Sequence, residues 1–215
     1  IQELISKKDK TEILWCGRFI SWKHPDDALS AAEKLKNDGI PFTLKFVGAG
    51  ETEEELRLFT KEKGLENNVV FLGNMHPEEV RTEMEKASVF ITTSDFQEGW
   101  GAVLNEAMNS GCAVVASHAA GSTPFLVKDG ENGFIYKSGD VNSLYEKIKK
   151  LLLSPELSEE FGEKAYKTIA EKWNADIAAQ RLITLSETLI SGKTPELYSD
   201  GPCSKAEILK NNWYK

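Results

Sequence analysis

Two glutamates enclose a glycine-rich turn near the middle of the chain, Glu98-Gly99-Trp100-Gly101-Ala102-Val103-Leu104-Asn105-Glu106. The glycines let a ligand approach the backbone closely. A helix is expected to begin here, and the first N–H groups of a helix have no partner within it, so they bind anions. Glu106, near the second turn of that helix, could accept hydrogen bonds from two ribose hydroxyls, and Glu98 would face whatever lies beyond the phosphates. The turn therefore predicts a site for a phosphate-bearing nucleotide ligand.

A pair of carboxylates also permits other interpretations. Glu98 and Glu106 could be the general acid and base of a glycoside hydrolase. We disfavour that assignment because a glycine-flanked helix start suits phosphate better than a neutral sugar. The plainest alternative is an ordinary helix N-terminus with acidic residues nearby, which the helix dipole favours.

Cations that could hold a phosphate occur in an earlier loop, Gly17-Arg18-Phe19-Ile20-Ser21-Trp22-Lys23. The guanidinium of Arg18 can grip two phosphate oxygens at once, and Lys23 adds a point charge. Gly17 allows the backbone to approach the ligand. Two solvated surface cations would look the same from spacing alone.

Two further loops are candidate contacts for the same ligand. The first is Gly48-Ala49-Gly50, which lacks the full glycine fingerprint of a dinucleotide fold, so a plain tight turn is the favoured explanation for this segment alone. The second contains Asn74 and Met75, where a nucleobase could lie against the backbone beside a soft thioether. The histidines His76 and His118 have no partner at metal-ligand spacing, so no metal site is predicted.

These loops need a framework that brings them together. Short, nearly continuous apolar runs alternate with amphipathic segments, which is typical of a doubly wound, mostly parallel, Rossmann-like α/β sheet covered on both faces. Helices are expected to begin at Asp26, Glu51 and Pro77, and to dominate from about residue 140 to 190. The expected strands are Ile13–Cys16, Phe42–Val47, Val69–Leu72, Ala87–Thr92, Cys112–Ala116 and Gly133–Tyr136. Ligands of such sheets lie at the carboxyl ends of the strands, where these loops begin.

The composition limits the kind of partner. Hydrophobic residues make up 40% of the 215-residue chain and the net charge is −8, without a basic stripe, so the chain is not expected to bind nucleic acid. No apolar stretch is long enough to span a membrane. Three cysteines without metal spacing favour a reducing, cytoplasmic location, with a peripheral position at the inner membrane face left open for the full-length protein.

Taken together, these segments resemble the C-terminal, donor-binding domain of retaining GT-B glycosyltransferases of the glycosyl transferases group 1 family. The resemblance rests on the two loops after the first strands, on Val70-Phe71-Leu72-Gly73, on the segment 98–116 and on Asp129-Gly130-Glu131-Asn132-Gly133. It covers about residues 11 to 190. This sequence departs from the family pattern at His24, where glycine is common, at Trp100, where phenylalanine is commoner, and at Phe125, where glutamate is usual.

The resemblance implies roles for the matched positions. Glu98, Arg18 and Lys23 would be the catalytic residues, with the two cations on the diphosphate and Glu98 at the donor sugar. Glu106 would hold the ribose. The donor-binding residues would further include Gly17, Gly48, Asn74, Met75, Gly99, Trp100, Gly101, Ala102 and Val103. No metal or other cofactor is implied; the substrate would be a nucleoside-diphosphate sugar.

The same resemblance sets the expected domain plan. Residues 1–190 would form the donor-binding domain and residues 191–215 a tail. The N-terminal acceptor domain of the family has no counterpart in this chain, so the fragment alone is expected to bind donor but to transfer little or no sugar. The full enzyme would be a hexosyltransferase acting in polysaccharide or glycolipid assembly. The alternatives are a nucleotide-sugar-binding module without turnover, or another GT-B enzyme such as an epimerase or phosphorylase; a dehydrogenase is disfavoured because the glycine fingerprint after the first strand is absent.

Overall fold

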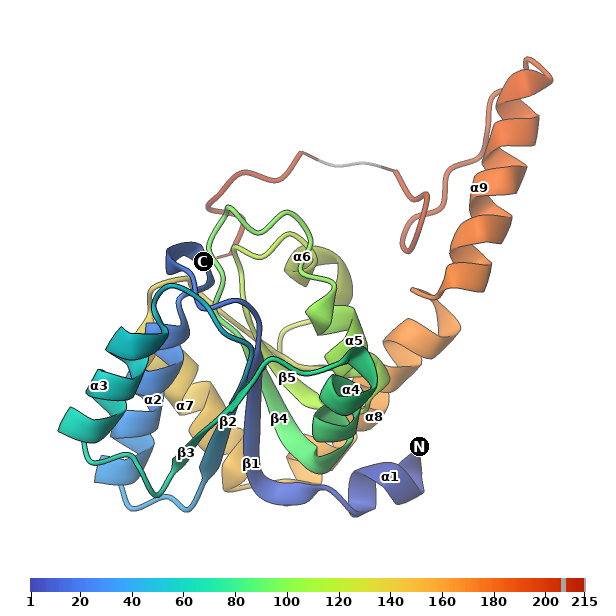
Figure 1. The fold of residues 1–215 in the computed structure, drawn as a ribbon. Helices are drawn as coiled ribbons and strands as arrows, with labels where there is room; N and C mark the ends of the chain where they lie inside the picture. The colour runs from blue at the N-terminus through green and yellow to red at the C-terminus, as the bar shows by residue number, and fades with distance from the viewer. Residues whose placement is uncertain (206–207, 215) are drawn as a thin grey trace.

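Six parallel strands form a single sheet at the centre of the molecule (Figure 1). The computed structural model describes residues 1–205 and 208–214. In sequence order the strands are β1 (Asp9–Cys16), β2 (Thr43–Val47), β3 (Val69–Gly73), β4 (Ala87–Thr92), β5 (Ala113–Ser117) and β6 (Phe134–Tyr136). They lie in the order β3-β2-β1-β4-β5-β6. The predicted doubly wound, Rossmann-like sheet is therefore confirmed.

Helices cover both faces of this sheet. One face carries α2 (Pro25–Asn37), α3 (Glu53–Glu62) and α7 (Val141–Leu152), and the other carries α4 (Pro77–Lys86), α5 (Val103–Asn109) and α8 (Pro155–Glu171). The remaining elements are α1 (Gln2–Ser6), a 3₁₀ turn η1 (Ser21–Lys23), α6 (Thr123–Leu126) and α9 (Ala175–Ile190). The predicted helix starts at Asp26, Glu51 and Pro77 correspond to α2, α3 and α4.

The strands supply two separate cores because successive side chains point to opposite faces. On β1, Ile13 and Trp15 enter the core under α2, α3 and α7, whereas Leu14 enters the core under α4, α5 and α8. On β4, Ile91 enters the core under α2, α3 and α7, and Phe90 enters the core under α4, α5 and α8. Burial on both faces explains the continuous apolar runs of the sequence.

The first strand begins four residues earlier than the apolar run Ile13–Cys16 predicts. Asp9 pairs with Ala87 and Glu12 with Thr43, so the polar start of β1 is hydrogen-bonded to both neighbouring strands. The buried carboxylate of Glu12 is neutralised by Lys45 on β2, at 2.7 Å. A hydrophobic pattern does not detect a strand whose polar residues are paired in this way.

The carboxyl ends of β1, β2 and β3 are held together by backbone hydrogen bonds. The N–H of Gly17 donates to Val47, and that of Gly48 donates to Gly73, at 3.0 and 2.8 Å. Gly48 has a φ of +128°, and a Cβ there would lie 1.9 Å from the carbonyl oxygen of Gly17. Glycine is required at this position for the two loops to touch.

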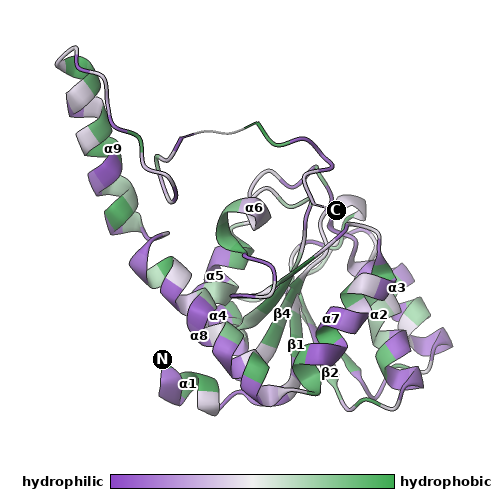
Figure 2. Ribbon diagram, turned by 180° about the vertical axis from the view of Figure 1, so that it is seen from behind, coloured by the Kyte–Doolittle hydropathy of each residue, from purple (hydrophilic) through white to green (hydrophobic). Residues whose placement is uncertain are grey.

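The last helix differs from the others in its surroundings. Helix α9 extends away from the sheet, and none of its residues is buried (Figure 1). Hydrophobic and hydrophilic residues alternate along its ribbon (Figure 2). Its exposed apolar side chains include Leu182, Ile183, Leu189 and Ile190.

Candidate functional site

The loops after β1 and β4 lie side by side, because the strand order reverses between these two strands. In open α/β sheets this reversal point is where ligands bind. A buried chain of hydrogen bonds joins the loops: Trp15 Nε1 donates to Thr93 Oγ1 at 2.9 Å, and Thr93 Oγ1 donates to the carbonyl of Lys23 at 2.5 Å. The backbone N–H of Asp95 donates to the carbonyl of Trp22 at 2.9 Å. Lys23 and the residues after β4 are thus fixed relative to each other.

The central feature of the site is an ion pair between Lys23 and Glu98. The side chains are only 18% and 16% exposed, and Ser94 Oγ donates a further hydrogen bond to Glu98 at 3.2 Å. Both residues were predicted from the sequence, Lys23 as a contact of the diphosphate and Glu98 as a contact of the donor sugar. The structure brings the ammonium and the carboxylate together, so in the ligand-free protein each compensates the charge of the other.

A cleft of about 330 Å³ opens beside this ion pair. Its lining includes an apolar wall formed by Met75, Pro77 and Val80, together with Glu106 and Cys16. Eight of the predicted site residues line this cleft: Gly17, Lys23, Met75, Glu98, Gly101, Ala102, Val103 and Glu106. An apolar wall opposite a few charged groups is the usual composition of a small-molecule site.

The other five predicted residues lie outside the lining of this cleft. Arg18 is exposed, with its guanidinium 5.9 Å from the ring of Trp22, and Asn74 and Gly99 are also exposed. Gly48 serves the loop contact described above. Trp100 is turned toward α5, where its Nε1 donates to Asn105 at 2.8 Å.

The helix after the turn begins at Val103, and Glu106 lies in its first turn rather than near its second. In residues 1–205 and 208–214, the backbone N–H groups of Gly99, Gly101, Ala102 and Val103 donate no hydrogen bond. Gly101 has a φ of +78°, which a glycine adopts readily. The turn therefore presents several unpaired donors beside the cleft.

Burial, with the Glu106 carboxylate as a second cause, raises the pKa of the Cys16 thiol to about 11. The thiol at the edge of the cleft therefore stays protonated near neutral pH and is a poor nucleophile. Glu106 lines the same cleft as this thiol. Cys16 ends the predicted strand Ile13–Cys16 and directly precedes Gly17, but it was not predicted as a site residue.

His24 and Asp95 support the site and were not predicted as site residues. His24 has a φ of +46°, the left-handed region that favours glycine, which explains why glycine is common there in the family pattern. Its Nε2 lies 3.2 Å from Asp95 Oδ2. Burial opposes ionisation of Asp95, but hydrogen bonds from Gln97 and His24 lower its pKa below the usual range. Asp95 could have been found as the first acidic residue after the predicted strand Ala87–Thr92.

Residues 211–214, near the end of the chain, return to the carboxyl edge of the sheet and pack on His118. The carbonyl of Asn211 lies 3.2 Å from His118 Nε2, and Trp213 Nε1 donates to the carbonyl of His118 at 3.1 Å. The ring of His118 also contacts Phe96, in the loop that carries Glu98, with centroids 5.2 Å apart. Part of the predicted tail is therefore packed on the domain.

Acidification is expected to weaken the packing of residues 211–214 around His118. His118 Nδ1 accepts a hydrogen bond from the N–H of Ser138 at 3.0 Å, which requires the neutral ring. Burial is the largest influence and lowers the pKa of His118 in the folded protein, whereas the hydrogen bond to Asn211 opposes this shift and the charge of Lys137 adds to it. As pH falls below about 6.5, the His118 ring is therefore protonated in the unfolded chain before it is protonated in the folded protein. The free energy of unfolding, which is at its full value above that pH, then decreases. Thermal unfolding between pH 7.5 and 5.5 should show a smaller decrease in Tm for His118→Gln than for the wild type; an equal decrease would contradict the assignment.

The profile of the family described as "Glycosyl transferases group 1" matches residues 1–168, which include the sheet, both loops and the cleft. The chain belongs to this family. Its relatives include poly(glycerol-phosphate) alpha-glucosyltransferase of Bacillus subtilis, 30% identical over 79% of this chain and 24% of that protein.

Solved structures of glycosyltransferases share the fold. The C-terminal domain of the group 1 protein LpcC from Francisella tularensis superposes with a TM-score of 0.70, at 23% identity, over 80% of this chain and 91% of that one. Anabaena HepE in complex with UDP gives a TM-score of 0.74 at 25% identity, over 86% of this chain and 50% of that one. The group 1 chain described here is thus a Rossmann-like domain of the GT-B type.

This group 1 chain spans about a quarter to a half of the length of the first curated relatives that it matches. Within residues 1–205 and 208–214, none of the helices has the length and hydrophobicity needed to span a bilayer. These residues also contain no group of three or more His, Cys, Asp or Glu side chains arranged to hold a metal ion.

Proposed function

We propose that this chain is the donor-binding domain of a retaining hexosyltransferase. The enzyme would transfer a sugar from a nucleoside-diphosphate sugar to an acceptor such as a growing polysaccharide or a glycolipid. The observation that carries the proposal is the cleft beside the Lys23–Glu98 ion pair, which combines an apolar wall, a cation and two carboxylates at the point where the strand order reverses.

The residues of the cleft match the parts of such a donor. Met75 offers an apolar contact for the base, and Glu106 offers a carboxylate for the ribose hydroxyls. Lys23 and the free N–H groups of the turn would stabilise the charge that develops on the departing nucleoside diphosphate, and Arg18 would join them on ligand binding. Glu98 would then face the transferred sugar. Fixed donors of this kind supply the stabilisation that a metal gives in other transferases, so we expect transfer without a required metal.

The relatives support this assignment through their own activities. The Bacillus protein is a glucosyltransferase that acts on poly(glycerol-phosphate), and HepE was solved with UDP. A donor carrying UDP and a polymeric acceptor are therefore the first substrates to test. We further propose that the enzyme works in the cytoplasm, with the full-length protein peripheral at the inner membrane face when the acceptor is a lipid.

A second domain is part of the proposal. We infer that an N-terminal acceptor domain packs on the exposed apolar residues of α9 and completes the catalytic site. The support is the short span of this chain relative to its relatives, together with the exposure of Leu182, Ile183, Leu189 and Ile190. The 215-residue chain is then expected to bind donor without transferring sugar at an appreciable rate, and robust transfer by this chain alone would contradict the inference.

Replacement of Glu106 by alanine tests the donor site. If its carboxylate holds two ribose hydroxyls, nucleotide affinity should fall by about 1–3 kcal/mol. Calorimetric titration of UDP, GDP and ADP into the wild type first identifies the base. Glu62→Ala, which removes an exposed glutamate at the end of α3, is the matched control and should leave affinity unchanged. Equal affinity of Glu106→Ala and wild type would remove Glu106 from the site.

A further inference from the structure

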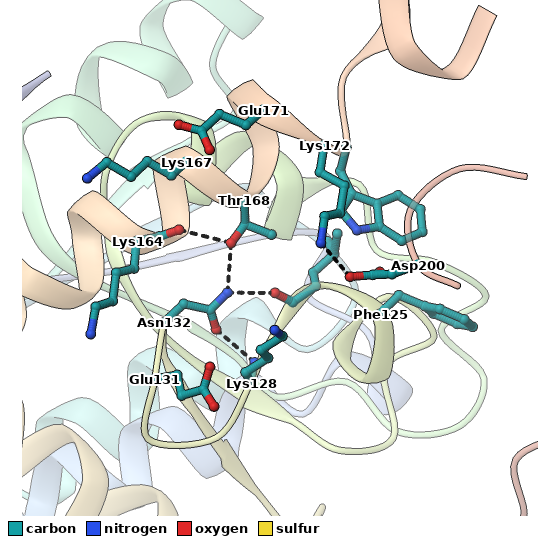
Figure 3. Close-up of a pocket in the computed structure, with 12 residues that line it drawn as sticks. Phe125, Lys128, Glu131, Asn132, Lys164, Lys167, Thr168, Glu171, Lys172 and Asp200 are labelled. Carbon is teal, nitrogen blue, oxygen red and sulfur yellow. Dashed lines mark hydrogen bonds and ion pairs between the residues drawn. The ribbon is translucent and has the colours of Figure 1, made fainter. Parts of the chain in front are cut away.

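A second cleft, of about 440 Å³, lies between α8, the loop after α6 and the tail residue Asp200 (Figure 3). Its apolar lining consists of Phe125, Leu126 and Trp173. The walls are held by buried Asn132, whose amide donates to the carbonyl of Leu126 and to Thr168 on α8, both at 2.9 Å. These hydrogen bonds join α6 and the loop after it to α8 beside the cleft.

An aromatic group connects this cleft to the turn of the donor site. The rings of Trp100 and Phe125 are stacked with centroids 5.7 Å apart, and Trp173 lies 5.7 Å from Trp100. Phe125 and Trp100 are 42% and 36% exposed, which is unusual for stacked aromatic side chains. Trp100 and Phe125, two residues at which this sequence departs from the family pattern, thus contact each other.

The backbone fixes this aromatic group to Glu98. The N–H of Gly121 donates to the carbonyl of Glu98 at 3.1 Å, and that of Ser122 donates to the carbonyl of Trp100 at 2.9 Å. A Cβ on Gly121 would lie 1.9 Å from the carbonyl oxygen of Gly99, so the two loops are in direct contact. Helix α6, which carries Phe125, begins immediately after these residues.

The rim of the cleft offers hydrogen-bond donors and acceptors in nearly equal number. Lys172 is paired with Asp200 at 2.6 Å, and Lys164 with Glu160 at 2.5 Å. Three rim side chains make no hydrogen bond or ion pair with the rest of the described chain, namely Lys128, Glu131 and Glu171, and the ammonium of Lys167 lies 3.9 Å from Glu163 on the same helix. Two cations beside two carboxylates favour a neutral ligand with many hydroxyls over an anion.

We propose that this second cleft is a saccharide subsite that holds part of a carbohydrate acceptor beside the donor turn. One face of a pyranose ring carries C–H bonds, which pack on the electron-rich faces of Phe125 and Trp173, while its hydroxyls pair with the charged rim. The inference rests on the proposed transferase function, because the subsite is assigned to the acceptor through its contact with the Glu98–Trp100 turn.

The test is a titration of the 215-residue chain with maltotriose, cellotriose and chitotriose, followed by tryptophan fluorescence and by the NMR signals of the indole N–H groups. At least one trisaccharide is expected to bind saturably and to shift the signals of Trp100 and Trp173. Phe125→Ala should weaken that binding about fivefold, the loss of one aromatic contact. Phe125→Leu, which preserves apolar packing, should show the same loss with an unchanged Tm.

UDP titrations of the same samples separate this inference from the proposed function. Phe125 does not line the donor cleft, so both variants should bind UDP as the wild type does. Phe96→Ala removes an aromatic ring of similar exposure outside the second cleft and should leave trisaccharide affinity unchanged. Binding of UDP without saturable binding of any trisaccharide, or saccharide binding that Phe125→Ala does not weaken, overturns the subsite. Failure of UDP to bind counts against the donor site instead.

Discussion

Lys23→Met is expected to reduce the affinity of the chain for UDP by one to two orders of magnitude. A hydrogen bond to a charged group contributes about 1.5–3 kcal/mol, and the substitution removes the cation that lies inside the donor cleft. It also leaves the Glu98 carboxylate, only 16% exposed, with Ser94 as its remaining side-chain partner among the described residues. That carboxylate would then repel the phosphates. Isothermal titration calorimetry at constant ionic strength measures the change.

Two further variants make this result interpretable. Lys86→Met removes another ion-paired lysine, which binds Glu83 at 2.6 Å outside the cleft, and should leave UDP affinity unchanged. In the double variant Lys23→Met, Glu98→Gln, the unpaired carboxylate is gone, so the loss should be smaller than the sum of the two single losses. Affinity of Lys23→Met within twofold of the wild type would exclude Lys23 from phosphate binding.

Gly48→Ala is expected to produce the largest loss of stability. The added Cβ would overlap the Gly17 carbonyl oxygen at 1.9 Å, and the φ of +128° is strained for any side chain. Relief requires separation of the β1 and β2 loops and loss of hydrogen bonds such as Gly17 N–H to Val47. We expect the free energy of unfolding to fall by more than about 3 kcal/mol, measured by urea denaturation.

Gly73→Ala provides the matched control at the end of the neighbouring strand. Gly73 also has a positive φ, of +72°, but no atom of the described chain beyond its immediate neighbours lies within 4 Å of a Cβ there. Only the left-handed backbone is then penalised, by about 1 kcal/mol. Similar losses in the two variants would show that close approach of the Gly17 and Gly48 loops is not what requires glycine.

Much of the framework follows from local patterns. Each predicted strand corresponds to an observed one, because burial on both faces leaves an apolar run that does not depend on distant contacts. The boundaries shift where polar residues are paired across strands, as at Asp9–Glu12, since this pairing involves residues far away in the chain. The start of α5 also lies later than expected, because Gly101 takes a left-handed backbone before the helix.

The candidate site was predicted less completely. The glycine turn, Lys23 and the two glutamates could be chosen from residue type and position after a strand. The ion pair between Lys23 and Glu98 could not, because it joins loops separated by 75 positions in sequence. The roles of Ser94, Asp95 and His24 were missed for the same reason.

By itself, the sequence determined the order of strands and helices, the family and the set of chemically active residue types, because these depend on local periodicity and on motifs continuous in the chain. Only the tertiary structure decided which residues share a cleft, that Lys23 neutralises Glu98, and that Trp100 and Phe125 stack beside a second cleft. Such contacts arise where the loops of different strands meet, and the pairing of loops is set by the strand order of the folded sheet. The turn from Glu98 to Glu106 is continuous in sequence, but its neighbours are not.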